Sequence, residues 1–172
     1  MHPYVKLAKE TVEQNLLFGR KYPDFKEDEL PPETLTQKGG VFVTLYQGDE
    51  LRGCIGTILA TQKNLAQEII ANSISAATAD YRFSPITKKE LPTIKYEVSI
   101  LSKPEQIDSP AKLNPEKYGV IVESGRKKGL LLPDLEDVDT IDDQIYIAAR
   151  KGGINLSKDK ITLYRFTTTK YK

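Results

Sequence analysis

The chain has 172 residues, with 25 lysines and arginines against 24 aspartates and glutamates, and its formal net charge is +1. This balance is typical of a globular protein and argues against a dedicated binder of nucleic-acid backbones, which usually carries a marked basic excess. Charged residues interrupt the first twenty positions, and no run approaches the ~20 apolar residues that cross a bilayer, so we expect a soluble, cytoplasmic protein without a signal peptide.

The first hundred residues predict a helix, a β-hairpin, a second helix and a further strand. Apolar residues recur every three or four positions over residues 3–19, which indicates an amphipathic helix. Two runs rich in β-branched and aromatic residues, 41–46 and 51–59, flank a turn and predict the hairpin. Asn64 is a good N-cap for the second helix, and residues 94–100 alternate with period two as a half-buried strand does.

The second half of the chain repeats this order. It predicts two strands, a helix and a closing strand, at residues 119–123, 129–132, 140–152 and 161–166. We therefore predict an α+β fold of two fused lobes, about 1–105 and 106–172, in which antiparallel sheets are packed by helices. The repeated order indicates an internal ββαβ duplication, and a cleft is expected where the lobes meet.

The segment 51–57 is the least ordinary part of the chain. On a strand its Arg52, Cys54 and Gly56 face the same way, and glycine inside a strand often marks a close approach to another group. An arginine beside a thiol favours the nucleophilic thiolate and offers a planar fork for carboxylate or phosphate. This predicts an anion or acyl site with Cys54 as nucleophile. The alternative is a buried cysteine packed as a small hydrophobe, with Arg52 paired to an acidic neighbour.

A second candidate segment follows the predicted second helix. Asp80 could orient Arg82 or Arg52, and the Tyr81 hydroxyl could reach a ligand. The alternative is a simple helix exit, in which Asp80 and Arg82 lie in solvent and Phe83 packs into the core.

Several segments together closely resemble the AMMECR-domain family, whose prokaryotic members are called AmmeMemoRadiSam system protein A. The matching motifs include the very specific Leu-Arg-Gly-Cys-Ile-Gly core and lie at residues 39–45, 51–58, 80–83, 97–101, 129–133 and 150–153. The resemblance runs from about Met1 to Phe166. It implies an α+β fold with two sub-domains and a cleft near the Arg-Gly-Cys motif, but no defined reaction. Tyr81 departs from the family, whose members commonly carry proline or serine there, and residues 132–139 look shorter than in many members.

These features leave three candidate functions for the protein. The first is a small enzyme or ligand-binding accessory for an anionic ligand, with Cys54 as nucleophile and six binding residues, Arg52, Gly53, Gly56, Thr57, Asp80 and Arg82. The second, implied by the resemblance, is an interaction module for Memo-like and radical-SAM partners. The third and weakest, nucleic-acid regulation, conflicts with the charge balance. No cofactor is predicted, and with one cysteine and one histidine in the chain neither a disulfide nor a Cys/His metal site is predicted.

Overall fold

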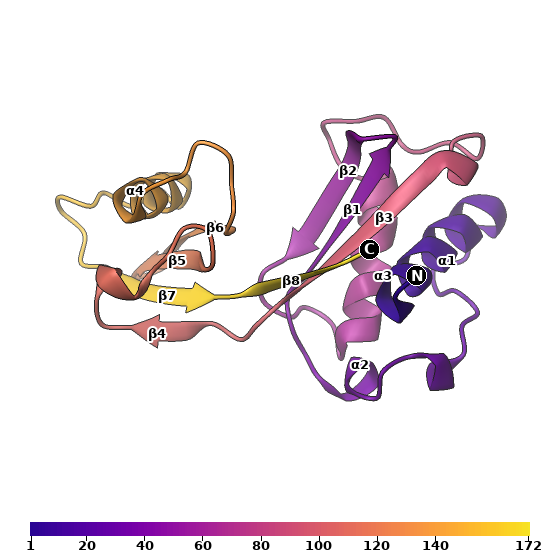
Figure 1. Cartoon of the computed structure of the whole chain (residues 1–172), viewed down its shortest axis with the longest axis horizontal. Helices are drawn as coiled ribbons and strands as arrows, with labels where there is room; N and C mark the ends of the chain where they lie inside the picture. Colours follow the sequence, from indigo (N-terminus) through magenta and orange to yellow (C-terminus); the bar gives the residue numbers. More distant parts are fainter. The chain divides into compact units, whose positions relative to one another are not determined.

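The computed structural model describes all 172 residues and divides into two compact units (Figure 1). The first unit consists of Met1–Leu101 and Thr169–Lys172, and the second of Ser102–Thr168. The predicted division placed all residues after about 105 in the second lobe. In the structure, Thr169–Lys172 return to the first unit as part of its sheet. None of the helices combines the length and the apolar character that a bilayer crossing needs.

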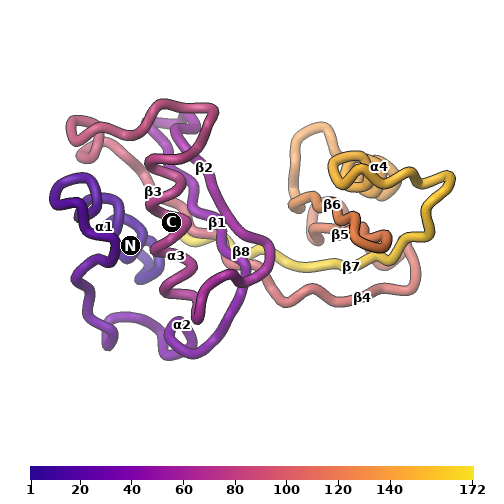
Figure 2. The backbone as a smooth tube through the Cα atoms, turned by 180° about the vertical axis from the view of Figure 1, so that it is seen from behind, coloured from indigo at the N-terminus to yellow at the C-terminus, as the bar shows by residue number.

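The first unit is a four-stranded sheet with three helices. Its elements are α1 (Pro3–Phe18), α2 (Glu33–Thr36), β1 (Val41–Gln47), β2 (Glu50–Thr57), α3 (Leu65–Thr78), β3 (Ile94–Leu101) and β8 (Thr168–Tyr171). The strands follow the order β2-β1-β3-β8 across the sheet. Helices α1 and α3 contact each other and pack on one face of the sheet, which Figure 2 shows from the helix side.

Alternation along β1 sends its apolar side chains toward these helices. Val41, Val43 and Leu45 are fully buried and belong to one core with Val12 of α1 and Ile69 of α3. The intervening residues of β1 point to the opposite face of the sheet, because successive side chains of a strand alternate. No helix of this unit covers that face, which is called the open face below.

The second unit is also a four-stranded antiparallel sheet, with one helix. Its elements are β4 (Glu105–Ile107), β5 (Gly119–Ser124), β6 (Lys127–Leu131), α4 (Ile141–Lys151) and β7 (Thr162–Phe166), and the strand order is β4-β7-β5-β6. Thr140 begins the helix by accepting the Asp143 N–H on its hydroxyl. Helix α4 packs on β5 and β6, and the core of this unit includes Val120, Val122 and Ala148.

Both units place a hairpin, a helix and a strand in the same chain order, and the first hairpin strand lies centrally in each sheet. A glycine of each second hairpin strand faces the helix: a methyl group on Gly53 would collide with the Ala76 carbonyl oxygen, and one on Gly129 with that of Ala148. The predicted α+β class, with two antiparallel sheets packed by helices, is confirmed. The internal duplication stays a prediction.

Candidate functional site

A β-bulge re-aims Arg52, the first predicted site residue along β2. Leu45 pairs with Gly53 and Tyr46 pairs with Leu51, so Arg52 has no partner on β1. An extra residue of this kind bends its strand and re-aims a side chain. The Arg52 side chain therefore reaches the loop between α3 and β3.

This loop holds the Arg52 guanidinium. Nε donates to Glu90 Oε1 at 2.8 Å and Nη1 donates to the Ser84 carbonyl oxygen at 2.8 Å. Nη2 donates at 3.4 Å to Glu90 Oε2 and to the Pro85 carbonyl oxygen. The hydrogen bond from Arg52 lowers the pKa of Glu90 to about 2. Arg52 is thus paired to an acidic neighbour, and its fork is already occupied.

Asp80 and Arg82 clamp the main chain of Cys54 at the outer edge of β2. The Cys54 N–H donates to Asp80 Oδ2 at 2.9 Å, and Arg82 Nη2 donates to the Cys54 carbonyl oxygen at 3.3 Å. The two side chains also pair with each other, since Arg82 Nη2 lies 2.7 Å from Asp80 Oδ2. The hydrogen bond from Arg82 holds the pKa of the buried Asp80 carboxyl well below its usual range. Asp80 therefore orients Arg82 and not Arg52, and the pair satisfies edge groups that lack a neighbouring strand.

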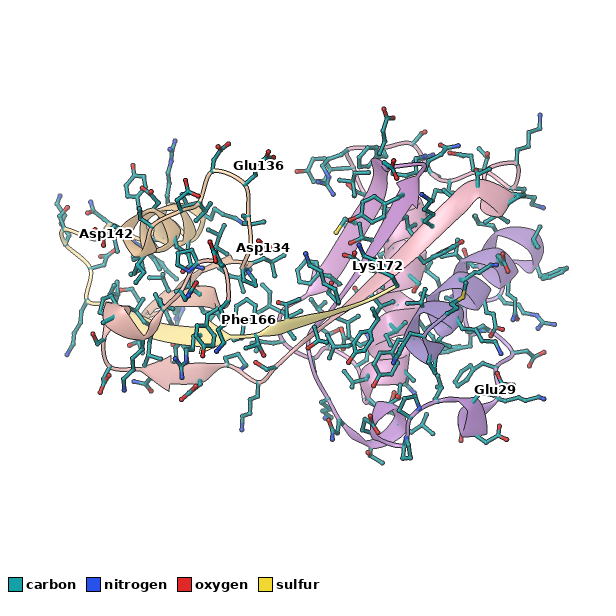
Figure 3. The ribbon with its side chains drawn as sticks, in the orientation of Figure 1. Glu29, Asp134, Glu136, Asp142, Phe166 and Lys172 are labelled. Carbon is teal, nitrogen blue, oxygen red and sulfur yellow. The ribbon has the colours of Figure 1, made fainter.

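A row of four polar side chains, called the polar row below, crosses the open face from one edge of the sheet to the other. Cys54 on β2 lies opposite Thr44 on β1, and Thr44 lies opposite Glu97 on β3. Cys54 Sγ and Thr44 Oγ1 are 3.3 Å apart, and Lys172, which follows β8, places Nζ 3.4 Å from Glu97 Oε2 (Figure 3, where Lys172 is labelled). Thr44 and Glu97 are buried, whereas Cys54 is half-buried and keeps its sulfur as a free thiol.

Tyr46 extends the polar row along β1 on the same face. Burial raises the pKa of its hydroxyl, and the nearby Glu97 carboxylate raises it further. The open face thus brings a thiol, two hydroxyl groups and a carboxylate into one neighbourhood. No group of three or more His, Cys, Asp or Glu side chains is placed to hold a metal ion.

The remaining predicted residues lie on both faces of β2. Gly56 shares the Cys54 face and lies under the ring of Phe42, which is opposite it on β1. Gly53 faces the backbone of α3 instead. Thr57 also faces α3, where its hydroxyl donates to the buried Glu68 carboxylate at 2.6 Å. Gly53 and Thr57 are therefore turned away from the thiol.

The structure brings together three predicted residues, Cys54, Asp80 and Arg82, and adds two that sequence reasoning missed, Thr44 and Glu97. A signal for both exists, because each is a polar residue between apolar residues of a strand. Their position beside Cys54 follows from the strand register, which a single sequence does not specify.

The family model AMMECR1 matches residues 5–171 of the chain. The chain belongs to the AMMECR1 family. A relative from Thermotoga maritima is 47% identical over 173 residues, which cover 99% of this chain and 98% of that protein. A relative from Clostridium acetobutylicum is 44% identical over 173 residues, which cover 99% of this chain but 36% of the clostridial protein.

A solved crystal structure has the same fold. The crystal structure of an uncharacterized protein from Pyrococcus horikoshii matches with a TM-score of 0.81 at 33% identity, over 98% of this chain and 89% of that chain. The resemblance read from the motifs is therefore confirmed at the level of family and fold. The names of these relatives state no activity.

Proposed function

We propose that this AMMECR1-family protein binds a small anionic ligand at the Cys54 end of the polar row, with the thiol as the reactive contact. The proposal rests on the hydrogen bonds that Asp80 and Arg82 make to the main chain of Cys54. Two charged side chains fix both main-chain polar groups of a single half-buried cysteine. Fixing the main chain restricts where the sulfur can lie, which is what a preorganised site requires. A reduced thiol of this kind fits a cytoplasmic location.

Arg82 supplies the positive charge for the ligand. Its side chain is 44% exposed, although the guanidinium donates three hydrogen bonds, two to Asp80 and one to the Cys54 carbonyl oxygen. A guanidinium that keeps an exposed side attracts an anion arriving from solvent. Arg52 is less suited to this role, because Glu90 and two carbonyl oxygens already occupy its fork. We therefore assign ligand attraction to Arg82 and a positioning role to Asp80.

Two alkylating reagents of similar size, anionic iodoacetate and neutral iodoacetamide, test the proposal without a known ligand. We expect the ratio of the iodoacetate rate to the iodoacetamide rate at Cys54 to be about fivefold higher in the native protein than in urea, since one nearby charge contributes about 1 kcal/mol in a watery surrounding. Mass spectrometry of the two adducts over time measures both rates.

Three variants identify the source of the selectivity. Arg82→Gln should return the ratio to its value in urea, whereas Arg82→Lys, which keeps the charge, should retain most of the preference. Arg126→Gln is the matched control, because it removes an exposed arginine from the turn between β5 and β6. Equal ratios in native and unfolded wild-type protein, or equal losses in Arg82→Gln and Arg126→Gln, would contradict the anion site.

A further inference from the structure

Helix α4 and the loop that joins it to β7 enclose a hollow of about 430 Å³, which is called the α4 hollow below. Figure 1 shows this loop leaving the end of α4. The helix contributes Tyr146, Ala149 and Arg150, and the loop contributes residues 153–157. All of these residues belong to the second unit, and none is near an end of the chain. A hollow of this volume is in the range of small-molecule sites.

Hydrogen bonds hold the loop wall of the α4 hollow in shape. Gly153 has a φ of 68°, the left-handed conformation that glycine adopts readily, and turns the chain out of the helix. Asn155 Oδ1 accepts the Ser157 N–H at 3.1 Å and the Ser157 hydroxyl at 2.7 Å. The Asn155 N–H donates to Asp159 Oδ2 at 2.8 Å. The wall is therefore formed before a ligand arrives, which reduces the entropy cost of binding.

The Arg150 side chain has no partner within the protein. Four of the six arginines are ion-paired, and the two that are not, Arg126 and Arg150, are both exposed. The end of α4 does not need the Arg150 side chain either, because the carbonyl oxygens of residues 148–150 accept N–H groups of residues 152–154. The Arg150 guanidinium is therefore free to bind a ligand in the α4 hollow.

The α4 hollow combines an aromatic ring with a positive charge. Arg150 is its only charged lining residue, and the segment 144–158 contains three basic residues and no acidic one. Tyr146 is 57% exposed and Leu156 is 40% exposed, so both offer apolar surface to a ligand. Tyr146 and Arg150 are four residues apart, so they lie on one side of α4, about 6 Å apart along its axis. A ligand that contacts both needs a ring and an anion at its two ends.

We propose that the α4 hollow binds a nucleoside monophosphate, with the base against the Tyr146 ring and the phosphate on the Arg150 guanidinium. A flat base stacks on an aromatic side chain, and a guanidinium binds phosphate through two parallel hydrogen bonds. The sugar between base and phosphate supplies the separation that one helical turn requires. The Asn155 Nδ2 group lines the same hollow, makes no hydrogen bond within the protein and can donate to oxygens of the ligand.

The charge of the segment favours a phosphate over a carboxylate. A phosphate monoester carries about −1.5 to −2 at neutral pH, which suits three basic residues without an acidic one. The inference is independent of the Cys54 site, because the two sites lie in different units.

Adenosine monophosphate is a suitable probe, and two fragments of it test the two contacts separately. Titration of the full chain, followed by NMR, should show saturable shifts of the amides of residues 146–157. Adenosine lacks the phosphate and ribose 5-phosphate lacks the base, so each should bind at least about tenfold more weakly than the whole probe.

Variants at two arginines of the same unit test the phosphate contact. Arg150→Gln should weaken binding of adenosine monophosphate about tenfold, because it removes both the charge and the planar fork. Arg150→Lys keeps the charge without the fork, so its affinity should lie between those of Arg150→Gln and the wild type. Arg126→Gln is the matched control, since Arg126 is the other exposed arginine without an ion pair, and in physiological salt it should leave the affinity within about twofold.

Variants at Tyr146 test the stacking contact. Tyr146→Ala should weaken binding about tenfold, whereas Tyr146→Phe keeps the ring and should retain the affinity within about twofold. Tyr146 and Arg150 are exposed, so these variants should fold, and urea melts that match the wild type check this.

Absence of saturable shifts, or equal affinity for adenosine monophosphate and either fragment, would overturn the proposal. Equal effects of Arg150→Gln and Arg126→Gln, or of Tyr146→Ala and Tyr146→Phe, would also overturn it. Shifts centred on residues 51–57 instead of residues 146–157 would overturn it as well, because the probe would then occupy the Cys54 site and not the α4 hollow.

Discussion

The charged side chains around Cys54 are paired with each other. Arg52 is paired with Glu90, and Arg82 with Asp80, and three of these four side chains are at least four-fifths buried. Removing one member of a buried pair is strongly destabilising, because it leaves a charge uncompensated. The charges therefore hold the strand and its flanking loop in place. The half-buried thiol and the exposed side of Arg82 are the groups left for a ligand.

Gly53 and Gly56 should respond differently to the same added methyl group. Gly53→Ala brings that group against the Ala76 carbonyl oxygen, which α3 holds in place, so we expect a loss of about 1–3 kcal/mol in the free energy of unfolding. Gly56→Ala meets the ring of Phe42, a side chain that can change its rotamer, so the loss should be smaller. Urea melts of the two variants measure both losses, and equal losses would contradict the assigned contacts.

Acid should destabilise the protein partly through Asp80 and Glu90. Hydrogen bonds from arginine lower the pKa of each carboxyl in the folded state, that of Glu90 to about 2. A lowered folded-state pKa contributes stability above the unfolded-state value, and this contribution is lost as pH falls through the folded-state value. The free energy of unfolding should therefore decline from about pH 5 to about pH 2. Glu90→Gln should decline less steeply in urea melts at each pH, and identical slopes would count against the pairing with Arg52.

At the scale of elements, β2 is an edge strand whose outer groups are satisfied by side chains. Asp80→Ala would free the Cys54 N–H and leave Arg82 without its partner, so we expect a loss of about 1–3 kcal/mol and faster hydrogen exchange at the Cys54 amide. Asp80→Asn keeps an oxygen acceptor, so the Cys54 amide should retain more of its protection from hydrogen exchange. An unchanged exchange rate at this amide in Asp80→Ala would show that the Asp80 and Arg82 side chains do not stabilise the edge of β2.

The elements that the sequence predicts are those with strong local signals. The β-branched runs of β1 and β2, and the caps at Asn64 and Thr140, place two strands and two helices within a few residues of their observed ends. The strands β4 and β8 were not predicted, because segments of three and four residues carry little periodicity. The return of β8 to the first unit depends on pairing with β3, far earlier in the chain, and no local pattern encodes it.

The candidate site was predictable only where strand alternation decides it. Alternation along β2 predicts that Cys54 and Gly56 share a face, and the pairing of β2 with β1 places them on the same face. Arg52 does not follow the alternation, because it is the unpaired residue of a β-bulge. The bulge arises from the pairing of β2 with β1, which no local pattern in the sequence specifies. Thr44 and Glu97 join the polar row through the register of three strands, so only the folded sheet brings them to the thiol.

At the scale of the whole molecule, each unit has its own hydrophobic core. Gly129 faces the Ala148 carbonyl in the second unit as Gly53 faces that of Ala76 in the first. Gly129→Ala should therefore speed hydrogen exchange in β5, β6 and α4 while leaving β1, β2 and α3 unchanged, since separate cores open separately. Equal acceleration in both units would contradict the independence of the cores. Matching local effects of Gly53→Ala and Gly129→Ala are expected if the two halves derive from one ββαβ unit.

The proposed site requires that Cys54 present its thiol from a fixed position in the folded protein. The most direct test is the rate of its reaction with iodoacetamide across a urea series below the unfolding transition. A thiol that is available in the native state reacts at a rate that hardly depends on the fraction of unfolded protein, whereas a sealed thiol reacts only through opening. We expect a measurable rate without urea that stays nearly constant up to the transition. A rate that rises in proportion to the unfolded fraction would contradict the proposed site.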